Sequence, residues 1–191
     1  VLVDCSILNT LYEGDAIPVD WAWDSADGIA VQDGARLAAE GCVLEGNTGI
    51  GIAAHSPGTE LLVVDTVIRD TLPDESGLGG HGIGVYDGAR MLAEGCELEG
   101  NHDAGILVSD SGTKATLVDT VIRDTQPDEY GEIGFGVVVQ GGGELWAQGC
   151  DISGNTSVGL YANHSGTGVR LLDSVVRNTL RLNDGRYGHG I

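Results

Sequence analysis

Apolar and polar residues alternate along most of this chain in short runs that are separated by Gly, Asp and Asn. Between positions 28 and 47 the apolar residues fall into three such runs, at Ile29/Val31, at 35–39 and at Cys42/Leu44. Period-2 runs bounded by turn-forming residues predict β-strands. We therefore expect three short strands in this stretch.

The same pattern recurs at a fixed distance along the chain. A constant period of this kind indicates a stack of units that bury their faces only against neighbouring units. The step is 54 residues (82−28, 136−82, 190−136), and it is carried by Gly28, Gly82, Gly136 and Gly190 and by the segments 65–71 (DTVIRDT), 119–125 (DTVIRDT) and 173–179 (DSVVRNT).

Each 54-residue unit divides into two similar halves, because 28–47 matches 51–71 with one residue inserted. We interpret each half as one coil of three strands. A helix over 35–41 (ARLAAEG) is the alternative, since Ala, Leu, Arg and Glu are good helix formers. The matching segment 59–65 (TELLVVD) contains β-branched residues that favour a pleated surface, and equivalent segments should share a conformation. The Leu-x-x-Leu-x-Leu pattern of leucine-rich repeats is absent.

Three recurrent features carry a family resemblance: a Gly-Ile start, a small residue before the third strand, and Gly-Asn corners at 46–47, 100–101 and 154–155. They resemble the right-handed parallel β-helix repeats of the pectate-lyase-like superfamily, from Cys5 onward. More loosely, the chain is similar to uncharacterised secreted bacterial β-helix repeat proteins. The resemblance implies an all-β, right-handed parallel β-helix of about seven coils.

We expect residues 1–191 to form a single β-helix segment of a longer array, because neither end shows a polar capping repeat. The stretch 11–27 is longer than its counterparts and is expected to be an inserted loop. In the folded repeat, Leu44, Ile68, Leu98, Ile122, Ile152 and Val176 should form one buried column, with Asn47, Asn101 and Asn155 bonded at a corner.

Composition narrows the set of partners. The 191 residues contain 29 acidic and 9 basic side chains, which gives a net charge of −20. Such a field repels nucleic acid and leaves cations, or simple solvation of the surface, as its interpretations. The resemblance implies an extracellular or cell-surface location, and we expect no membrane span in this segment.

Three cysteines follow the repeat at Cys42, Cys96 and Cys150. Two coils separate each pair by about 9.6 Å, which is too far for a disulfide. Cys5 falls one coil below Cys42, where either a disulfide or two packed thiols would fit.

The outward positions of the first strand predict a ligand-binding face. Small residues such as Ala53 and Gly84 lie beside a polar row, which would leave a shallow groove, and the resemblance implies a polysaccharide there. Trp21 and Trp23, on the inserted loop, could stack on sugar rings or pack as a flap. The polar row consists of Gln32, His55, Tyr86, Ser109, Gln140 and Asn163.

Long loops precede the first strand in every second coil, at 72–81, 126–135 and 180–189. Ca²⁺ prefers six to eight oxygen ligands, so it is the cation expected at such acidic loops. Pro-Asp-Glu followed by Gly is also ordinary turn chemistry, and no cofactor is required. The candidate metal ligands are Asp74, Glu75, Asp128 and Glu129.

No catalytic residue is assigned. Gly-His-Gly elements occur around His81 and His189, and they are similar to the element found in polygalacturonases, but Phe135 takes the equivalent place in the middle copy. The repeats are near-equivalent, whereas catalysis usually breaks a repeat in one coil. We therefore expect a non-catalytic structural or carbohydrate-binding array. The alternative is a polysaccharide lyase or glycoside hydrolase whose catalytic coils lie partly or wholly outside this sequence.

The second and third strands suggest two further surfaces. Leu62, Leu92 and Trp146, with Val64, Val118 and Leu172, should form an apolar outward strip that contacts another protein chain or segment. On the third strand, outward charges should alternate up the stack and favour in-register pairing. They are Glu45, Arg69, Glu99, Arg123, Ser153 and Arg177.

Overall fold

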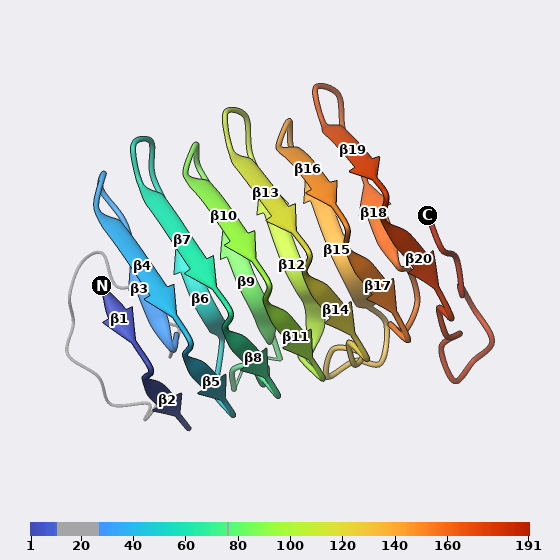
Figure 1. The fold of residues 1–191 in the computed structure, drawn as a ribbon. Coiled ribbons are helices and arrows are strands. Elements are labelled where there is room, and N and C mark those ends of the chain that lie inside the picture. The colour runs from blue at the N-terminus through green and yellow to red at the C-terminus, as the bar shows by residue number, and fades with distance from the viewer. Residues whose placement is uncertain (11–26, 76) are drawn as a thin grey trace.

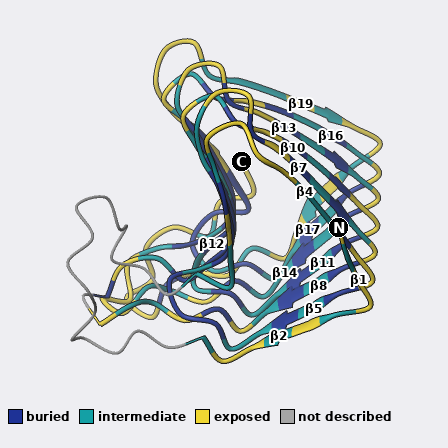
Figure 2. Ribbon diagram, turned by 90° about the vertical axis from the view of Figure 1, so that its left-hand side faces the viewer, coloured by how far each residue is buried: buried dark blue, intermediate teal, exposed yellow. Residues whose placement is uncertain are grey.

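The computed structural model describes residues 1–10, 27–75 and 77–191, and within them the chain winds through three strands per coil. Strands of the same kind stack in parallel, so the coils form three parallel sheets around a common interior (Figures 1 and 2). The described residues contain strands and turns but no helix, and therefore no helix that could cross a membrane. The protein is an all-β, right-handed parallel β-helix, as the sequence predicts.

We number the three sheets by their place in the coil. The first sheet has the order β18 (Leu160–Ala162), β15 (Gly134–Gln140), β12 (Asp103–Ser109), β9 (His81–Val85), β6 (Ile50–Ala54) and β3 (Ile29–Val31). The second sheet has the order β1 (Leu2–Val3), β4 (Arg36–Glu40), β7 (Glu60–Val64), β10 (Arg90–Glu94), β13 (Lys114–Val118), β16 (Glu144–Gln148) and β19 (Gly168–Leu172). The third has the order β2 (Ser6–Leu8), β5 (Val43–Glu45), β8 (Val67–Arg69), β11 (Glu97–Glu99), β14 (Val121–Arg123), β17 (Asp151–Ser153) and β20 (Val175–Arg177).

The core consists of stacked columns of Leu, Ile and Val. In the third sheet each central residue pairs in register with its equivalent in the next coil, which confirms the predicted column. Five of its members are fully buried, and Val176 on β20 is partly buried. A one-residue slip would turn this column to solvent, so the register is strongly specified. The buried members are Leu44, Ile68, Leu98, Ile122 and Ile152.

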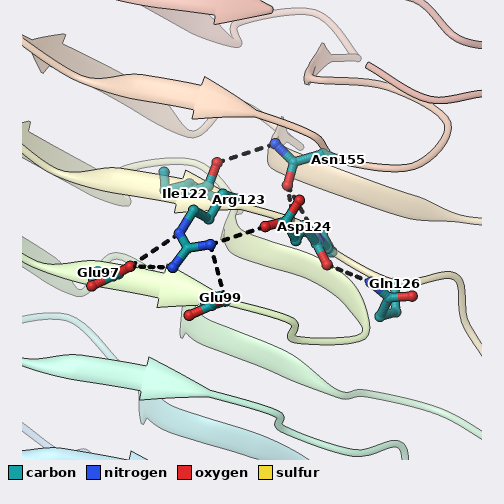
Figure 3. A network of polar contacts seen from close by, with 8 residues as sticks. Glu97, Glu99, Ile122, Arg123, Asp124, Gln126 and Asn155 are labelled. Carbon is teal, nitrogen blue, oxygen red and sulfur yellow. Dashed lines mark hydrogen bonds and ion pairs between the residues drawn. The ribbon is translucent and has the colours of Figure 1, made fainter. Parts of the chain in front are cut away.

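Buried asparagines hold the corner after the third strand, as predicted. The amide nitrogen of Asn101 donates to the carbonyl of Ile68 at 3.0 Å, and its Oδ1 accepts the backbone N–H of Thr71 at 3.2 Å. Asn47 and Asn155 make equivalent bonds, and Figure 3 shows Asn155 beside the coil below it. Each Asn therefore satisfies two backbone groups that the turn removes from the strand ladder.

Aspartate and glycine alternate at a second corner, where the backbone adopts positive φ. Gly95 has a φ of +64° and Asp65 in the preceding coil has a φ of +46°. A Cβ added at Gly95 would overlap Oδ1 of Asp65. The glycine is therefore required twice, for its backbone conformation and for the space that the carboxylate occupies.

Ion pairs join the outer faces of the third-sheet strands. Arg123 contacts Glu97 at 2.7 Å, Glu99 at 2.8 Å and Asp124 at 3.1 Å (Figure 3). Arg69 contacts Glu45 at 2.8 Å. The predicted charge ladder is thus present, although Arg123 also forms ion pairs with Glu97 and Asp124, which lie outside the predicted column. Exposed pairs of this kind contribute little individually, about 0.2–1 kcal/mol each.

All four cysteines lie in the described residues and are free thiols. Cys42, Cys96 and Cys150 are buried, with Thr66 and Thr120 buried in the intervening coils. Burial, together with a hydrogen bond to Cys42, raises the pKa of Cys5 to about 11. Of the two arrangements that the sequence allowed for Cys5 and Cys42, the structure contains the packed thiols.

Candidate functional site

The outer face of the first sheet collects the residues expected to bind a ligand. The strands pair in register, for example Ala54 with Val85 and Ser109 with Gln140, so the following outward positions stack above one another. This places the whole predicted polar row on one face. Its members, in coil order, are Gln32, His55, Tyr86, Ser109, Gln140 and Asn163.

The row is less open than the small neighbouring residues suggested. The ring of Tyr86 lies over Gly84, where an added Cβ would collide with it, and stacks on His55 with ring centroids 4.6 Å apart. Ala53 is fully buried and Ser109 nearly so. The expected continuous groove along Ala53 and Gly84 is therefore wrong, because the glycine makes room for an aromatic ring instead.

Burial also sets the ionisation of this aromatic pair. It lowers the pKa of His55, against the opposing effect of Asp87 and Asp110. It raises the pKa of Tyr86, and nearby carboxylates including Asp27 add to that rise. At neutral pH the two rings are uncharged, so the face offers them as hydrogen-bonding and stacking groups.

A hollow of about 170 Å³ opens on the same face, near the start of β9, β12 and β15. Its apolar wall includes Phe135, which stacks on Tyr161 with ring centroids 5.3 Å apart. Tyr161 is 37% exposed at the edge of this face. The lining residues are His81, Asp103, Ala104, Leu107, Ile133, Phe135, Val138 and Gln140.

His81 and Asp103 come together in this hollow from neighbouring strands. Nδ1 of His81 lies 3.5 Å from Oδ2 of Asp103 and makes no hydrogen bond. Burial lowers the pKa of His81 to about 4, and burial together with the charge of Asp128 raises the pKa of Asp103 to about 7. Between those two pH values both side chains are neutral, so the contact is an uncharged one over that range.

The pair interrupts the repeat, and sequence reasoning missed it. One repeat before and one after, Asp103 is replaced by Gly49 and Ser157 (103−54, 103+54). His81 corresponds in the same way to Asp27 and Phe135 (81−54, 81+54). The replacement of His81 by Phe135 in the next repeat gives no sign of a site unless the residue of the adjoining coil is considered with it. Comparing the two half-repeats together would have shown one unmatched His-carboxylate pair.

Asp103 has a positive φ of +59°, as several other aspartates of this chain do. In the coil below, the equivalent position is Gly80, with a φ of +88°. Left-handed residues other than Gly cost about 1–2 kcal/mol, less for Asp and Asn. Because aspartates with positive φ recur at the corners of this chain, the backbone conformation alone does not distinguish Asp103, and its distinguishing feature is the histidine beside it.

The acidic loops lie beside this region. The four candidate metal ligands share one hollow of about 290 Å³ with Pro73 and His102. Two of the carboxylates also stabilise turns: Oδ1 of Asp74 accepts the N–H of Leu78, and Oδ1 of Asp128 accepts the N–H of Glu132. Within the described residues, no three His, Cys, Asp or Glu side chains are grouped so as to hold a metal ion.

His102 also lines this second hollow, and a hydrogen bond shows which of its ring nitrogens carries the hydrogen. Its Nδ1 lies 2.9 Å from the carbonyl oxygen of Pro127. A carbonyl only accepts, so Nδ1 carries a hydrogen and Nε2 is the acceptor of the neutral ring. Sequence analysis did not single out His102, because it falls outside the acidic segments themselves.

The apolar strip of the second sheet differs from its prediction. Leu62, Leu92 and Trp146 share one column, whereas Val64 and Val118 belong to the next outward column, where Glu40, Glu94 and Gln148 alternate with apolar residues. All six residues of the predicted strip thus lie on the outer face, in two adjacent columns, and the second column is interrupted by Glu40, Glu94 and Gln148. A hollow of about 460 Å³ does lie here, and its outward lining includes Ala38, Leu62 and Leu92.

Trp21 and Trp23, the aromatic residues proposed to cover the first sheet, lie outside the described residues. The site therefore consists of the first-sheet row, the hollow with His81 and Asp103, and the neighbouring acidic hollow.

The chain belongs to the family described as right handed beta helix region, whose family model matches residues 4–184. No curated protein matches it. Among solved structures it is similar to pectate lyase Pel9A, with 15% identity and a TM-score of 0.47, over 80% of this chain and 51% of that one. This chain spans about half the length of that protein.

Proposed function

We propose that this β-helix segment binds a neutral polysaccharide along the outer face of its first sheet and does not itself catalyse a reaction. The observation that carries the proposal is the in-register row of hydrogen-bonding side chains, which includes the stacked pair His55–Tyr86 and lies beside a second stacked pair, Phe135–Tyr161. Carbohydrate sites combine such polar groups with exposed rings, because a sugar has a polar rim and apolar faces.

The acidic surface favours a neutral chain over a polyanion. The protein carries a net charge of −20, and carboxylates of Asp27, Asp87, Asp103 and Asp110 act on the rings of this face. A polyuronate would bring further negative charge to the same surface, at a cost that only bound cations could offset. An extracellular or cell-surface location is part of this proposal.

A glycan array, probed with and without Ca²⁺, tests the proposal first. Calorimetry on the best neutral ligand should then show at least tenfold weaker binding for Tyr161→Ala and for Gln140→Ala, since both remove contacts at the open end of the row. Thr116→Ala, on the outer face of the second sheet, is the matched control and should bind as the wild-type chain does. Equal binding by all variants would place any glycan elsewhere.

A second candidate, a polysaccharide lyase or hydrolase, is favoured by the His81–Asp103 pair alone. Its remaining catalytic groups would have to come from coils outside this sequence. Incubation of the bound glycan with the chain, followed by assays for new reducing ends and for unsaturated products, separates the two candidates. We expect neither product to form above the level given by heat-denatured protein.

A further inference from the structure

We infer that the hollow lined by His81, Asp103 and Gln140 is a subsite for the acetamido group of an N-acetylated amino sugar. The inference rests on the proposed function, because it names the sugar class that the first-sheet face would select. It is carried by the size of the hollow, by the chemistry of its walls, by a buried nitrogen without a hydrogen bond, and by the break in the repeat.

The hollow matches a small group that is half apolar and half polar. Its volume of about 170 Å³ is too small for a chain of sugar rings and large enough for one substituent with part of its ring. Leu107, Val138 and Phe135 provide apolar walls beside the polar groups. A methyl group gains about 0.8 kcal/mol per carbon buried against such walls.

The polar groups of the hollow match an amide. The Gln140 side chain offers N–H donors, and the carboxyl of Asp103 and the free ring nitrogen of His81 offer acceptors on the adjacent strands. The N–H of an acetamido group can donate to Asp103 or His81, while Gln140, which pairs six residues further along the sheet, borders the other end of the hollow. A sugar hydroxyl would satisfy one of these groups but would leave the apolar walls unfilled.

The unpaired Nδ1 atom of His81 is the observation that most directly favours a bound ligand. His81 is only 9% exposed, and this nitrogen has no hydrogen-bond partner, with the nearest carboxylate oxygen of Asp103 at 3.5 Å. A buried polar atom left unpaired costs about 1–3 kcal/mol. A ligand amide in the hollow would supply a partner, and the gain would appear as affinity.

The His81 position recurs at His189, but among the described residues a carboxylate stands beside the histidine only at His81 and Asp103. The equivalent places in the neighbouring repeats hold Asp27 with Gly49, and Phe135 with Ser157, so neither reproduces a His beside a carboxylate. A structural role would be expected to recur with the repeat, as the corner Asn residues do. One subsite per chain predicts that one acetamido group is recognised for each protein molecule.

The test compares three tetrasaccharides with the same backbone: β-1,4-linked N-acetylglucosamine, glucose, and glucosamine without the acetyl group. They differ in the substituent at one carbon, which is acetamido, hydroxyl or ammonium. By calorimetry we expect the acetylated tetramer to bind the wild-type chain with a stoichiometry of one and at least tenfold more tightly than the glucose tetramer.

Asp103→Gly is the informative variant, because glycine suits the positive φ and occupies the equivalent positions at Gly49 and Gly80. It should reduce the preference for the acetylated tetramer over the glucose tetramer at least fivefold. Asp87→Asn, an exposed aspartate that also has positive φ, is the control and should keep the preference. Thermal melts of each variant establish that it is folded.

Three results would overturn the inference. Equal binding of the acetylated and glucose tetramers would leave a glycan-binding face without this subsite. Tighter binding of the glucosamine tetramer would identify an ammonium site instead. If neither these sugars nor any glycan on the array binds, both the proposed function and the subsite fail.

Discussion

The partly buried carboxyl of Asp103 should make the stability of the protein depend on pH. Burial and the charge of Asp128 raise its pKa from 3.8 to about 7. The folded protein therefore holds this proton more tightly than the unfolded chain does. For an acid whose pKa is raised on folding, stability is greatest below the unfolded pKa, falls as pH rises from about 4 to about 7, and is constant above that range.

Asp103→Asn removes the titration and keeps the shape of the side chain, and Asn tolerates the φ of +59°. A pKa rise from 3.8 to about 7 corresponds to an upper limit of about 4 kcal/mol. The variant should match the wild-type free energy of unfolding at pH 4 and exceed it by up to about 4 kcal/mol at pH 8.

Urea denaturation followed by circular dichroism at pH 4, 6 and 8 measures that difference. His81, whose pKa is lowered to about 4, titrates in both proteins and so cancels in the comparison. Asp87→Asn removes an exposed carboxylate and is the control. A difference that does not change with pH, or an Asn variant less stable than wild type at pH 8, would refute the reasoning.

Four further predictions concern the scaffold and the remaining surfaces. Gly95→Ala should cost about 1–3 kcal/mol of unfolding free energy more than Gly131→Ala. Both glycines have positive φ, but only a Cβ at position 95 would overlap a carboxylate, that of Asp65. Equal thermal destabilisation by the two variants would contradict the stacking of Asp65 on Gly95. Asn101→Ala leaves two buried backbone groups unpaired and should cost about 2–6 kcal/mol in chemical denaturation, so a loss under about 1 kcal/mol would count against the corner. Asp128→Asn should weaken Ca²⁺ binding in calorimetry with the fold intact, and absent Ca²⁺ binding in wild type would leave these loops as turns. We expect the wild-type chain to self-associate in sedimentation velocity and Leu92→Glu to be monomeric; a strictly monomeric wild-type chain would argue against the apolar contact.

The repeat made the scaffold predictable from the sequence. Apolar alternation and the 54-residue step specify which face of each strand is buried, because a shift of one residue would expose the column through Leu44 and Ile68. The corner asparagines were predictable for the same reason, since each recurs at one position of the coil. Periodic features can be recognised in a single sequence because its successive repeats can be aligned with one another.

The site was less predictable, because it depends on how unlike residues meet across coils. The polar row was placed correctly, but the way Tyr86 folds over Gly84 depends on a rotamer that the pattern does not fix. The outward face of the apolar strip was predictable, but the charged residues that interrupt its second column, Glu40 and Glu94, were not considered. Asp103 was overlooked because it is unexceptional as a single aspartate, and only its place beside His81 makes it unusual.

The central claim, that glycans bind on the outer face of the first sheet, is tested most directly by mapping a bound glycan onto the protein. Backbone amide NMR spectra recorded during titration with the best array ligand would locate the contacts. We predict that the shifted resonances cluster on β9, β12 and β15, around His81, Asp103 and Gln140. Shifts centred instead on the second-sheet hollow beside Leu62 and Leu92 would contradict the claim.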